Sequence, residues 1–163
     1  MLTVALILLG ILAYVWTAHH LSYHVGKKRI LKRRRWDLNI CCGRTDGGGM
    51  NADIATQTDL PSFFLVSDIY RLPFPDSHFE HVLCSHTIEH VDHPESFFKE
   101  LQRVGRRVTI VVPPLWDIGA ALDIFEHKWI FLTFRKVHTA LPKHIRFPLA
   151  EALHVRLGQW IRG

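Results

Sequence analysis

The side chains best suited to acid–base chemistry gather in one short segment, residues 86–90, with the sequence H-T-I-E-H. Histidine gains and loses a proton near neutral pH, and a glutamate does so when its surroundings raise its pKa. His86, Glu89 and His90 are therefore the candidate catalytic residues. On a helix, the histidines and glutamate of this pattern could instead bind zinc and activate a water molecule. The segment predicts proton transfer. The alternatives are a structural hydrogen-bonded cluster at a strand-helix junction and metal-assisted hydrolysis.

Short apolar runs separated by turns must position this segment. The runs with strand-like composition are residues 36–41, 51–54, 62–69, 81–86 and 106–114, and residues 89–104 have a helix-like pattern. This alternation predicts an α/β fold with a parallel, doubly wound sheet. The first two runs are joined by a glycine-rich loop, CGRTDGGG, which is too short for a crossover helix of ~10 residues. Ligands of such sheets bind at the carboxyl ends of the strands, where residues 86–90 begin.

Three segments follow one another in a characteristic order: LNICCG with NADI, then SDIYRLPFPDSHFEHVLCSHTIEHVDHPESFFKELQRV, then VTIVVPP. This order resembles the class I S-adenosylmethionine-dependent methyltransferases, in the small branch whose first motif is L-N-[LI]-G-C-G followed by N-x-D. The middle segment is similar to the family's L-P-F-x-D and H-x-[LI]-E-H motifs and leads into E-[LI]-x-R-V. The resemblance covers roughly residues 37–114. It implies a truncated Rossmann-like sheet and S-adenosylmethionine as a cofactor.

The glycine-rich loop would form the wall of the cofactor site in this family. Glycines leave room for backbone N–H groups to approach a ligand closely. By resemblance, Cys41, Cys42, Gly43 and the glycines at 47–49 would supply that wall. Cys41 stands where the family motif has its first glycine, so a side chain occupies a position that is usually bare.

The resemblance also assigns roles to residues that follow the later strands. Asp53, at the end of the second strand, would accept hydrogen bonds from the two ribose hydroxyls. Asp68 would accept from the adenine amino group. Ser85 and Thr87 would lie near the sulfonium methyl, with His86 the first candidate for a general base. We expect no metal ligand, because a zinc-binding helix at 86–90 would have to begin inside the fourth strand.

The resemblance weakens toward the C-terminus. After Val104 the family inserts a leucine-lysine-proline-Gly-Gly turn, whereas this chain continues through Gly105 directly into a strand. The 49 residues after Pro114 do not show the pattern of the usual sixth and seventh antiparallel strands. The substrate side of the fold is therefore predicted to be truncated, which leaves both an active enzyme and a degenerate domain open.

The N-terminus has the features of a membrane anchor. Seventeen uncharged residues, 2–18, would span about 25 Å as a helix at ~1.5 Å per residue. Seven Lys and Arg residues follow between 27 and 35, and none precede the apolar run. The positive-inside rule then predicts a single-pass protein with its N-terminus outside and its C-terminal domain in the cytoplasm. A cleaved signal peptide and a buried core helix are the alternatives.

Charge is divided unevenly along the chain. Residues 1–35 carry a net charge of +7, residues 36–126 carry −8 and residues 127–163 carry +6. Basic flanks around an acidic centre favour a domain held against anionic lipid rather than a nucleic-acid-binding protein. The three cysteines, two of them adjacent, indicate a reducing compartment without a disulfide framework.

The chain thus divides into a transmembrane helix (1–25), a basic juxtamembrane segment (26–35), a methyltransferase-like α/β domain (36–126) and a basic amphipathic segment (127–163). In the last segment, two prolines are expected to separate short helices that lie in the membrane interface or cover the sheet. One such helix would carry an apolar face formed by Trp129, Phe131, Leu132, Phe134 and Val137.

These features favour a membrane-anchored, S-adenosylmethionine-dependent methyltransferase-like protein that acts on a lipid, quinone or membrane-protein substrate. The alternative is a non-catalytic accessory subunit of an integral membrane protein complex, in which the degenerate domain serves assembly. The expected partners are membrane lipids and other integral membrane proteins, and not nucleic acid.

Overall fold

The computed structural model describes residues 1–33, 35–56, 59–148 and 150–159. Its main sheet contains β1 (Leu38–Ile40), β2 (Met50–Asp53), β3 (Phe63–Leu65), β4 (Phe79–Ser85), β5 (Gly105–Val111) and β7 (Val137–His138). The strand order is β3-β2-β1-β4-β5-β7, with β1 to β5 parallel and β7 antiparallel to β5. The chain winds outward from β1 to β3 and then crosses to β4 on the other side of β1. The predicted α/β fold with a parallel sheet is confirmed.

One face of the sheet is covered by α3 (Pro94–Val104). Its buried Phe97, Leu101 and Val104 are spaced by four and three residues and so lie on one side of the helix. They pack against Val82 and Ile110 of the sheet in one apolar core. Pro94 occupies the first turn, where its missing N–H is tolerated, so the helix begins five residues later than the sequence pattern predicts.

The opposite face of the sheet is covered by the N-terminal helix. Leu83 and Val111 alternate with the residues that face α3, and they pack against Ile30 and Trp36 in a second, smaller cluster. Ile30 belongs to α2 (Lys28–Lys32), which continues α1 (Leu2–His19) through a π-helical segment, His20–Lys27, as one helix of 31 residues. The sheet is therefore sandwiched between α3 and the end of this helix.

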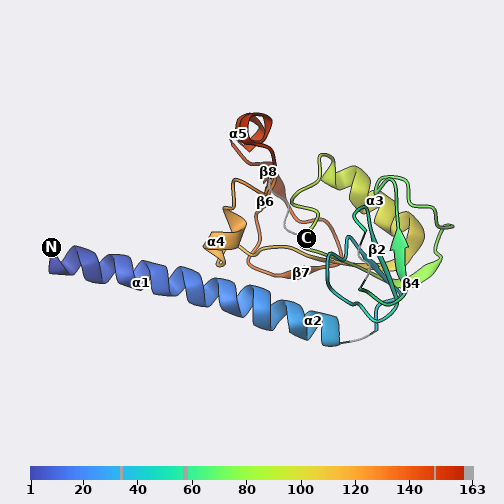
Figure 1. Cartoon of the computed structure of the whole chain (residues 1–163), viewed down its shortest axis with the longest axis horizontal. Coiled ribbons are helices and arrows are strands. Elements are labelled where there is room, and N and C mark those ends of the chain that lie inside the picture. Colours follow the sequence, from blue (N-terminus) through green and yellow to red (C-terminus); the bar gives the residue numbers. More distant parts are fainter. Residues whose placement is uncertain (34, 57–58, 149, 160–163) are drawn as a thin grey trace.

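Figure 1 shows the first half of the N-terminal helix projecting away from the domain. Its apolar side chains are exposed: Leu2, Val4, Leu6, Ile7, Leu8, Leu9, Ile11 and Leu12. The second half contacts the domain, where Tyr14 donates a hydrogen bond of 2.8 Å to the Trp116 carbonyl and Ser22 accepts one of 2.7 Å from Lys136. A fully buried core helix is thus excluded for this segment. Length and composition suit a membrane span, but a signal sequence passes the same test.

The C-terminal segment differs most from its prediction. Residues 129–138 do not form a helix but strands, with β6 (Trp129–Phe131) pairing antiparallel to β8 (His144–Arg146) in a small second sheet. β7 completes the edge of the main sheet beside β5, so an antiparallel strand that the sequence pattern did not reveal is present. The helices of this half are short: α4 (Ile118–Ala121) and α5 (Ala150–Leu157).

Candidate cofactor and catalytic cleft

A cleft of about 720 Å³ opens at the carboxyl ends of the strands, beside the point where the chain crosses from one half of the sheet to the other. Its walls include Cys41, Gly43, Asp53, Asp68, His86 and His90. These residues come from the loops after β1, β2, β3 and β4. The topological switch point of an open α/β sheet is where ligands bind, and this volume lies in the range of small-molecule sites.

Asp53 ties the loop after β1 to the end of β2. Its carboxylate accepts hydrogen bonds from the backbone N–H groups of Gly43, at 2.8 Å, and of Ala55, at 3.2 Å. The side chain is largely buried but still borders the cleft. A carboxylate has about four lone-pair sites, so Asp53 retains capacity for a ligand's hydroxyl groups.

Cys41 adopts a left-handed backbone conformation, with φ of 52°. A residue with a Cβ is strained there by roughly 1–2 kcal/mol, which explains why a glycine suits the position. Its thiol borders the cleft. Burial, with a smaller effect of Cys84 and Asp53, holds the pKa of the Cys41 thiol well above its usual range. Burial likewise raises the pKa of Cys42 to about 11, so both side chains are neutral thiols at pH 7.

Several predicted cofactor residues do not border the cleft. Cys42 is buried, and its Sγ lies 3.4 Å from the Gly43 carbonyl oxygen. Ser85 is only partly buried, but its hydroxyl is enclosed and has no hydrogen-bond partner among the described residues. Thr87 lies at the cleft wall instead. Asp68 is exposed at the mouth, where it accepts a 2.8 Å hydrogen bond from the Tyr70 N–H.

The glycines at 47–49 were expected in the cofactor wall, and the structure contradicts this. A Cβ on Gly47 would meet the Asn39 side chain at 2.6 Å, and one on Gly49 would overlap the Trp36 carbonyl oxygen. Trp36 also donates its backbone N–H to the Gly47 carbonyl at 3.0 Å. These glycines therefore let the loop pack along the start of β1, at the edge of the sheet away from the cleft.

His86 leaves the end of β4 with a φ of 55°, a second strained conformation at the cleft. Burial lowers the pKa of His86, so the imidazole is neutral at pH 7 and able to accept a proton. Its Nδ1 lies 3.4 Å from a carboxylate oxygen of Glu89, and its ring contacts that of Tyr23 from the N-terminal helix at 5.5 Å between centroids. Residues 86–90 form turns rather than a helix, so the alternative of a zinc-peptidase site, which needs both histidines on one helix, is wrong.

Glu89 lies beneath the cleft wall and is fully buried. Burial alone would raise the pKa of Glu89, but the contact with His86 and the nearby His90 and His127 outweigh it and lower the pKa overall. His127 was missed in the sequence because no local pattern distinguishes it from the other histidines. It lies against His90, with ring centroids 4.8 Å apart, and burial lowers its pKa to about 4.

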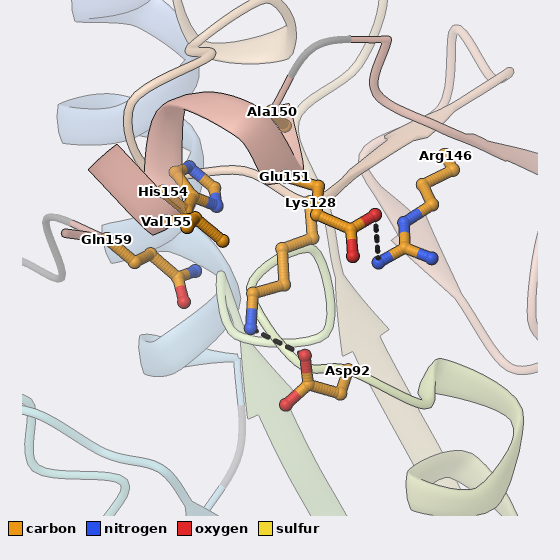
Figure 2. Close-up of a pocket in the computed structure, with 8 residues that line it drawn as sticks. All are labelled: Asp92, Lys128, Arg146, Ala150, Glu151, His154, Val155 and Gln159. Carbon is orange, nitrogen blue, oxygen red and sulfur yellow. Dashed lines mark hydrogen bonds and ion pairs between the residues drawn. The ribbon is translucent and has the colours of Figure 1, made fainter. Parts of the chain in front are cut away.

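A smaller pocket of about 330 Å³ adjoins the cleft beside α5. Figure 2 shows that its charged side chains point at one another: Lys128 donates to Asp92 at 2.6 Å, and Arg146 contacts Glu151 at 3.1 Å. Asp92 and Lys128 border both spaces, so this ion pair stands at the rim of the larger cleft.

A mostly parallel sheet of this order defines a Rossmann-like α/β fold, and in such folds ligands bind at the switch point where this cleft opens. Residues 48–112 match the family model described as a methyltransferase domain. The matched residues lie within the segment 37–114, whose motif order resembles the S-adenosylmethionine-dependent methyltransferases, so the match supports that resemblance. No curated protein matches the sequence.

Three of the solved structures that the chain matches come from Haloferax volcanii, Aquifex aeolicus and Pyrococcus horikoshii. The chain is 18% identical to a putative methyltransferase of Haloferax volcanii solved with the activator Trm112, covering 61% of this chain and 56% of that one (TM-score 0.41). It is 16% identical to a SAM-dependent methyltransferase of Aquifex aeolicus, covering 57% and 66% (TM-score 0.42). It is 18% identical to the PH0226 protein of Pyrococcus horikoshii, covering 87% of this chain and 81% of that one (TM-score 0.43). The chain spans less than two thirds of the first two structures.

S-adenosylmethionine is the cofactor that this family implies, and the cleft fits it in most respects. Gly43, with a φ of 52° and no side chain, leaves its backbone open to a ligand, and Asp53 retains acceptor capacity beside it. Cys41 also lines this wall, at the position where the family motif has a glycine.

Proposed function

We propose that this protein is a membrane-anchored, S-adenosylmethionine-dependent methyltransferase that acts on a membrane-associated substrate. The observation that carries the proposal is the cleft at the switch point, where Asp53, Asp68 and His86 converge from three separate loops. Acceptor-rich carboxylates on one side and a neutral imidazole on the other suit a site that holds a nucleoside and deprotonates a nucleophile.

Each of these residues has a role in the proposal. Asp53 would hold the two ribose hydroxyls, and Asp68 would accept from the adenine amino group. The cofactor supplies an activated methyl group, whose transfer depends largely on holding the acceptor in line. His86 would accept a proton from a hydroxyl or amine acceptor at the cleft wall. Glu89 does not reach the cleft, so we assign it a positioning role through His86, while His90 borders the cleft and remains a candidate base.

The membrane part of the proposal rests on the N-terminal helix. Residues 2–18 would cross most of a hydrocarbon core of ~30 Å, with the basic residues 27–35 on the cytoplasmic side. Since the domain contacts Tyr14, which lies within residues 2–18, its nearest edge would enter the membrane interface. That edge is apolar: α4 packs against α1, and Ile118 and Phe134 beside it are exposed. The edge therefore suits the interface.

The distance from the membrane to the cleft supports a membrane-associated substrate. Tyr23 of the N-terminal helix contacts His86 at the cleft. Tyr23 lies five residues beyond Ala18, which is about 8 Å along a helix. A lipid headgroup, a quinone ring or a juxtamembrane protein segment would need to rise only this far to reach the cleft.

Titration of S-adenosylhomocysteine into the detergent-solubilised protein tests the enzymatic proposal. We expect binding at micromolar concentration, and about tenfold tighter binding by Cys41→Gly, which removes the side chain from the cleft wall and relieves its strained φ. Absence of binding to the folded wild type, with binding restored in Cys41→Gly, would instead favour the accessory subunit that has lost the cofactor. Absence in both would contradict the cleft assignment.

Vesicle flotation tests the anchor. Ile7 and Leu9 are exposed on the projecting half of the helix, so lysines there should not disturb the domain. Each lysine near the centre of a bilayer costs about 3 kcal/mol, and the Ile7→Lys, Leu9→Lys double variant should therefore remain largely with the soluble fraction. Leu157→Lys, at an equally exposed apolar position on α5, should float as wild type does. Flotation of the double variant would contradict a membrane-spanning helix.

A further inference from the structure

Two segments that lie far apart in the sequence, residues 89–90 and residue 127, bring three side chains together at the cleft wall. Each of Glu89, His90 and His127 offers a ligand atom, and these atoms all lie within 4.8 Å of one another. His90 and His127 meet edge to face, with ring planes at 72°. Two imidazoles and one carboxylate form a donor set that suits a divalent transition metal.

The backbone holds the two segments of this cluster together. The Glu89 carbonyl accepts hydrogen bonds from the N–H groups of Lys128, at 2.8 Å, and Trp129, at 3.2 Å. The Trp129 indole also donates to the Val91 carbonyl at 2.9 Å. These bonds hold the two residues that follow His127 against Glu89 and Val91, so the backbone of the fold places His127 beside Glu89.

The carboxylate of Glu89 lacks the partners that a buried charge needs. The residue is fully buried, and neither of its side-chain oxygens has a hydrogen-bond partner among the described residues. Nδ1 of His86 lies 3.4 Å from the Oε1 atom of Glu89, but the two atoms do not have hydrogen-bond geometry. An enclosed, unsatisfied carboxylate is costly, and a bound cation would remove that cost.

The orientation of His90 also matches that of a metal ligand. Its Nδ1 lies 2.9 Å from the Glu126 carbonyl oxygen. In the tautomer that donates this hydrogen bond, Nε2 carries a free lone pair. Histidines that bind metals commonly donate their other ring N–H to a carbonyl in this way, because it fixes both the tautomer and the direction of the ring.

We propose that Glu89, His90 and His127 bind one divalent transition metal ion, such as zinc. His90 borders the cleft, so a fourth coordination position would open toward it. Three protein ligands with one open position are the arrangement of catalytic rather than structural zinc sites. The open position would bind an oxygen atom of the methyl acceptor and lower the pKa of its hydroxyl group. This role rests on the proposed function, whereas the metal site itself does not.

The test is titration of zinc and cobalt into the full-length protein after treatment with a chelator. His20 and His24 lie one turn apart on the N-terminal helix and could bind metal themselves, so a His20→Gln background removes that competing pair. We expect one equivalent of either metal to bind. Bound cobalt should give the intense visible absorption of a four-coordinate site, which reports the ligands directly and needs no catalytic activity.

Variants separate the cluster from other histidines. His127→Ala and His90→Asn should each weaken metal binding by at least 100-fold. His144→Ala is the matched control, because His144 also contacts a glutamate, Glu95, at 2.9 Å but lies outside the cluster, and it should bind metal as wild type does. Circular dichroism establishes whether each variant is folded. If only one of the two cluster variants folds, that variant alone tests the site.

Two results would overturn the site: no saturable binding of zinc or cobalt by folded wild type, or equal affinity in the folded His127→Ala and His90→Asn variants. Titration of S-adenosylhomocysteine into the metal-free protein keeps this test separate from the proposed function. If the folded wild type binds S-adenosylhomocysteine but no metal, the metal site alone is contradicted. If it binds metal but no S-adenosylhomocysteine, the methyltransferase proposal alone is contradicted.

Discussion

Asp53→Ala should weaken the binding of S-adenosylhomocysteine by about 100-fold. In the proposed complex the carboxylate accepts two hydrogen bonds from the ribose, and charge-assisted bonds of this kind contribute about 1.5–3 kcal/mol each. Loss of about 2.7 kcal/mol corresponds to the expected change in affinity. Calorimetric titration of the detergent-solubilised variant measures it directly.

The difficulty with this variant is that Asp53 also binds the Gly43 and Ala55 backbone, so its loss could loosen the loop. Asp46→Ala is the matched control. Asp46 accepts a 2.8 Å hydrogen bond from the Gly48 N–H in the same loop, but near the start of β2 rather than at the cleft. The Asp46→Ala variant should lower the stability of the domain without changing its affinity for S-adenosylhomocysteine. Equal loss of binding in both variants would assign the effect to the loop, and unchanged binding in Asp53→Ala would remove Asp53 from the cofactor site.

The sequence predicted the sheet well because its strands are local patterns. The runs around Leu38, Asn51 and Val82 were each placed within a few residues of the observed strands. The position of the cleft followed from the parallel order, since the carboxyl ends of parallel strands meet at one edge. Asp53, the last residue of β2, and His86, directly after β4, both border this cleft, and their roles there remain a prediction.

The glycines at 47–49 were misplaced because composition alone does not show which end of a strand a loop follows. β1 and β2 are parallel, and Leu38 pairs with Met50. The nine connecting residues must therefore return along the whole of β1. Gly49 passes so close to Trp36 that a side chain would overlap its carbonyl oxygen. Close backbone approach, and not cofactor binding, requires these glycines.

His127 and the C-terminal strands could not be found in the sequence because their partners are distant. Val137 pairs with Val111 across 26 residues, in a strand only two residues long. Such a strand has no alternating pattern to detect. His127 reaches Glu89 only because Lys128 and Trp129 bind the Glu89 backbone. Tertiary contacts of this kind carry no local signal.

The most specific part of the family resemblance also has a structural explanation. The L-P-F-P-D segment at 72–76 and the E-L-Q-R-V segment at 100–104 are joined by Arg103. Its five N–H groups bind five acceptor atoms: both Glu100 carboxylate oxygens at 2.9 and 2.6 Å, the Leu72 and Phe74 carbonyls at 3.0 and 2.8 Å, and an Asp76 oxygen at 2.7 Å. These two motifs therefore fix the loop between β3 and β4 onto α3, and we expect the stability of the domain to depend on them.

Arg103→Ala should lower the free energy of unfolding by about 3 kcal/mol, because it leaves the largely buried Glu100 carboxylate without its cation. Arg103→Lys should lose about 2 kcal/mol, since one ammonium offers three donors in place of five.

The same interaction makes stability depend on pH. The hydrogen bonds from Arg103 lower the pKa of Glu100, so their contribution is complete above the ordinary glutamate pKa of ~4.3 and is lost as pH falls through the lower pKa of the folded state. Urea unfolding from pH 7 to pH 3 should therefore show the wild type and Arg103→Lys converging at low pH. Arg106→Lys is the control, because Arg106 is exposed and its 3.8 Å contact with Glu80 should contribute less than about 1 kcal/mol. If the difference in free energy of unfolding between wild type and Arg103→Lys stays constant across this range, the charge of Glu100 does not contribute to stability. The contacts of Arg103 with the carbonyl groups would then alone hold the loop.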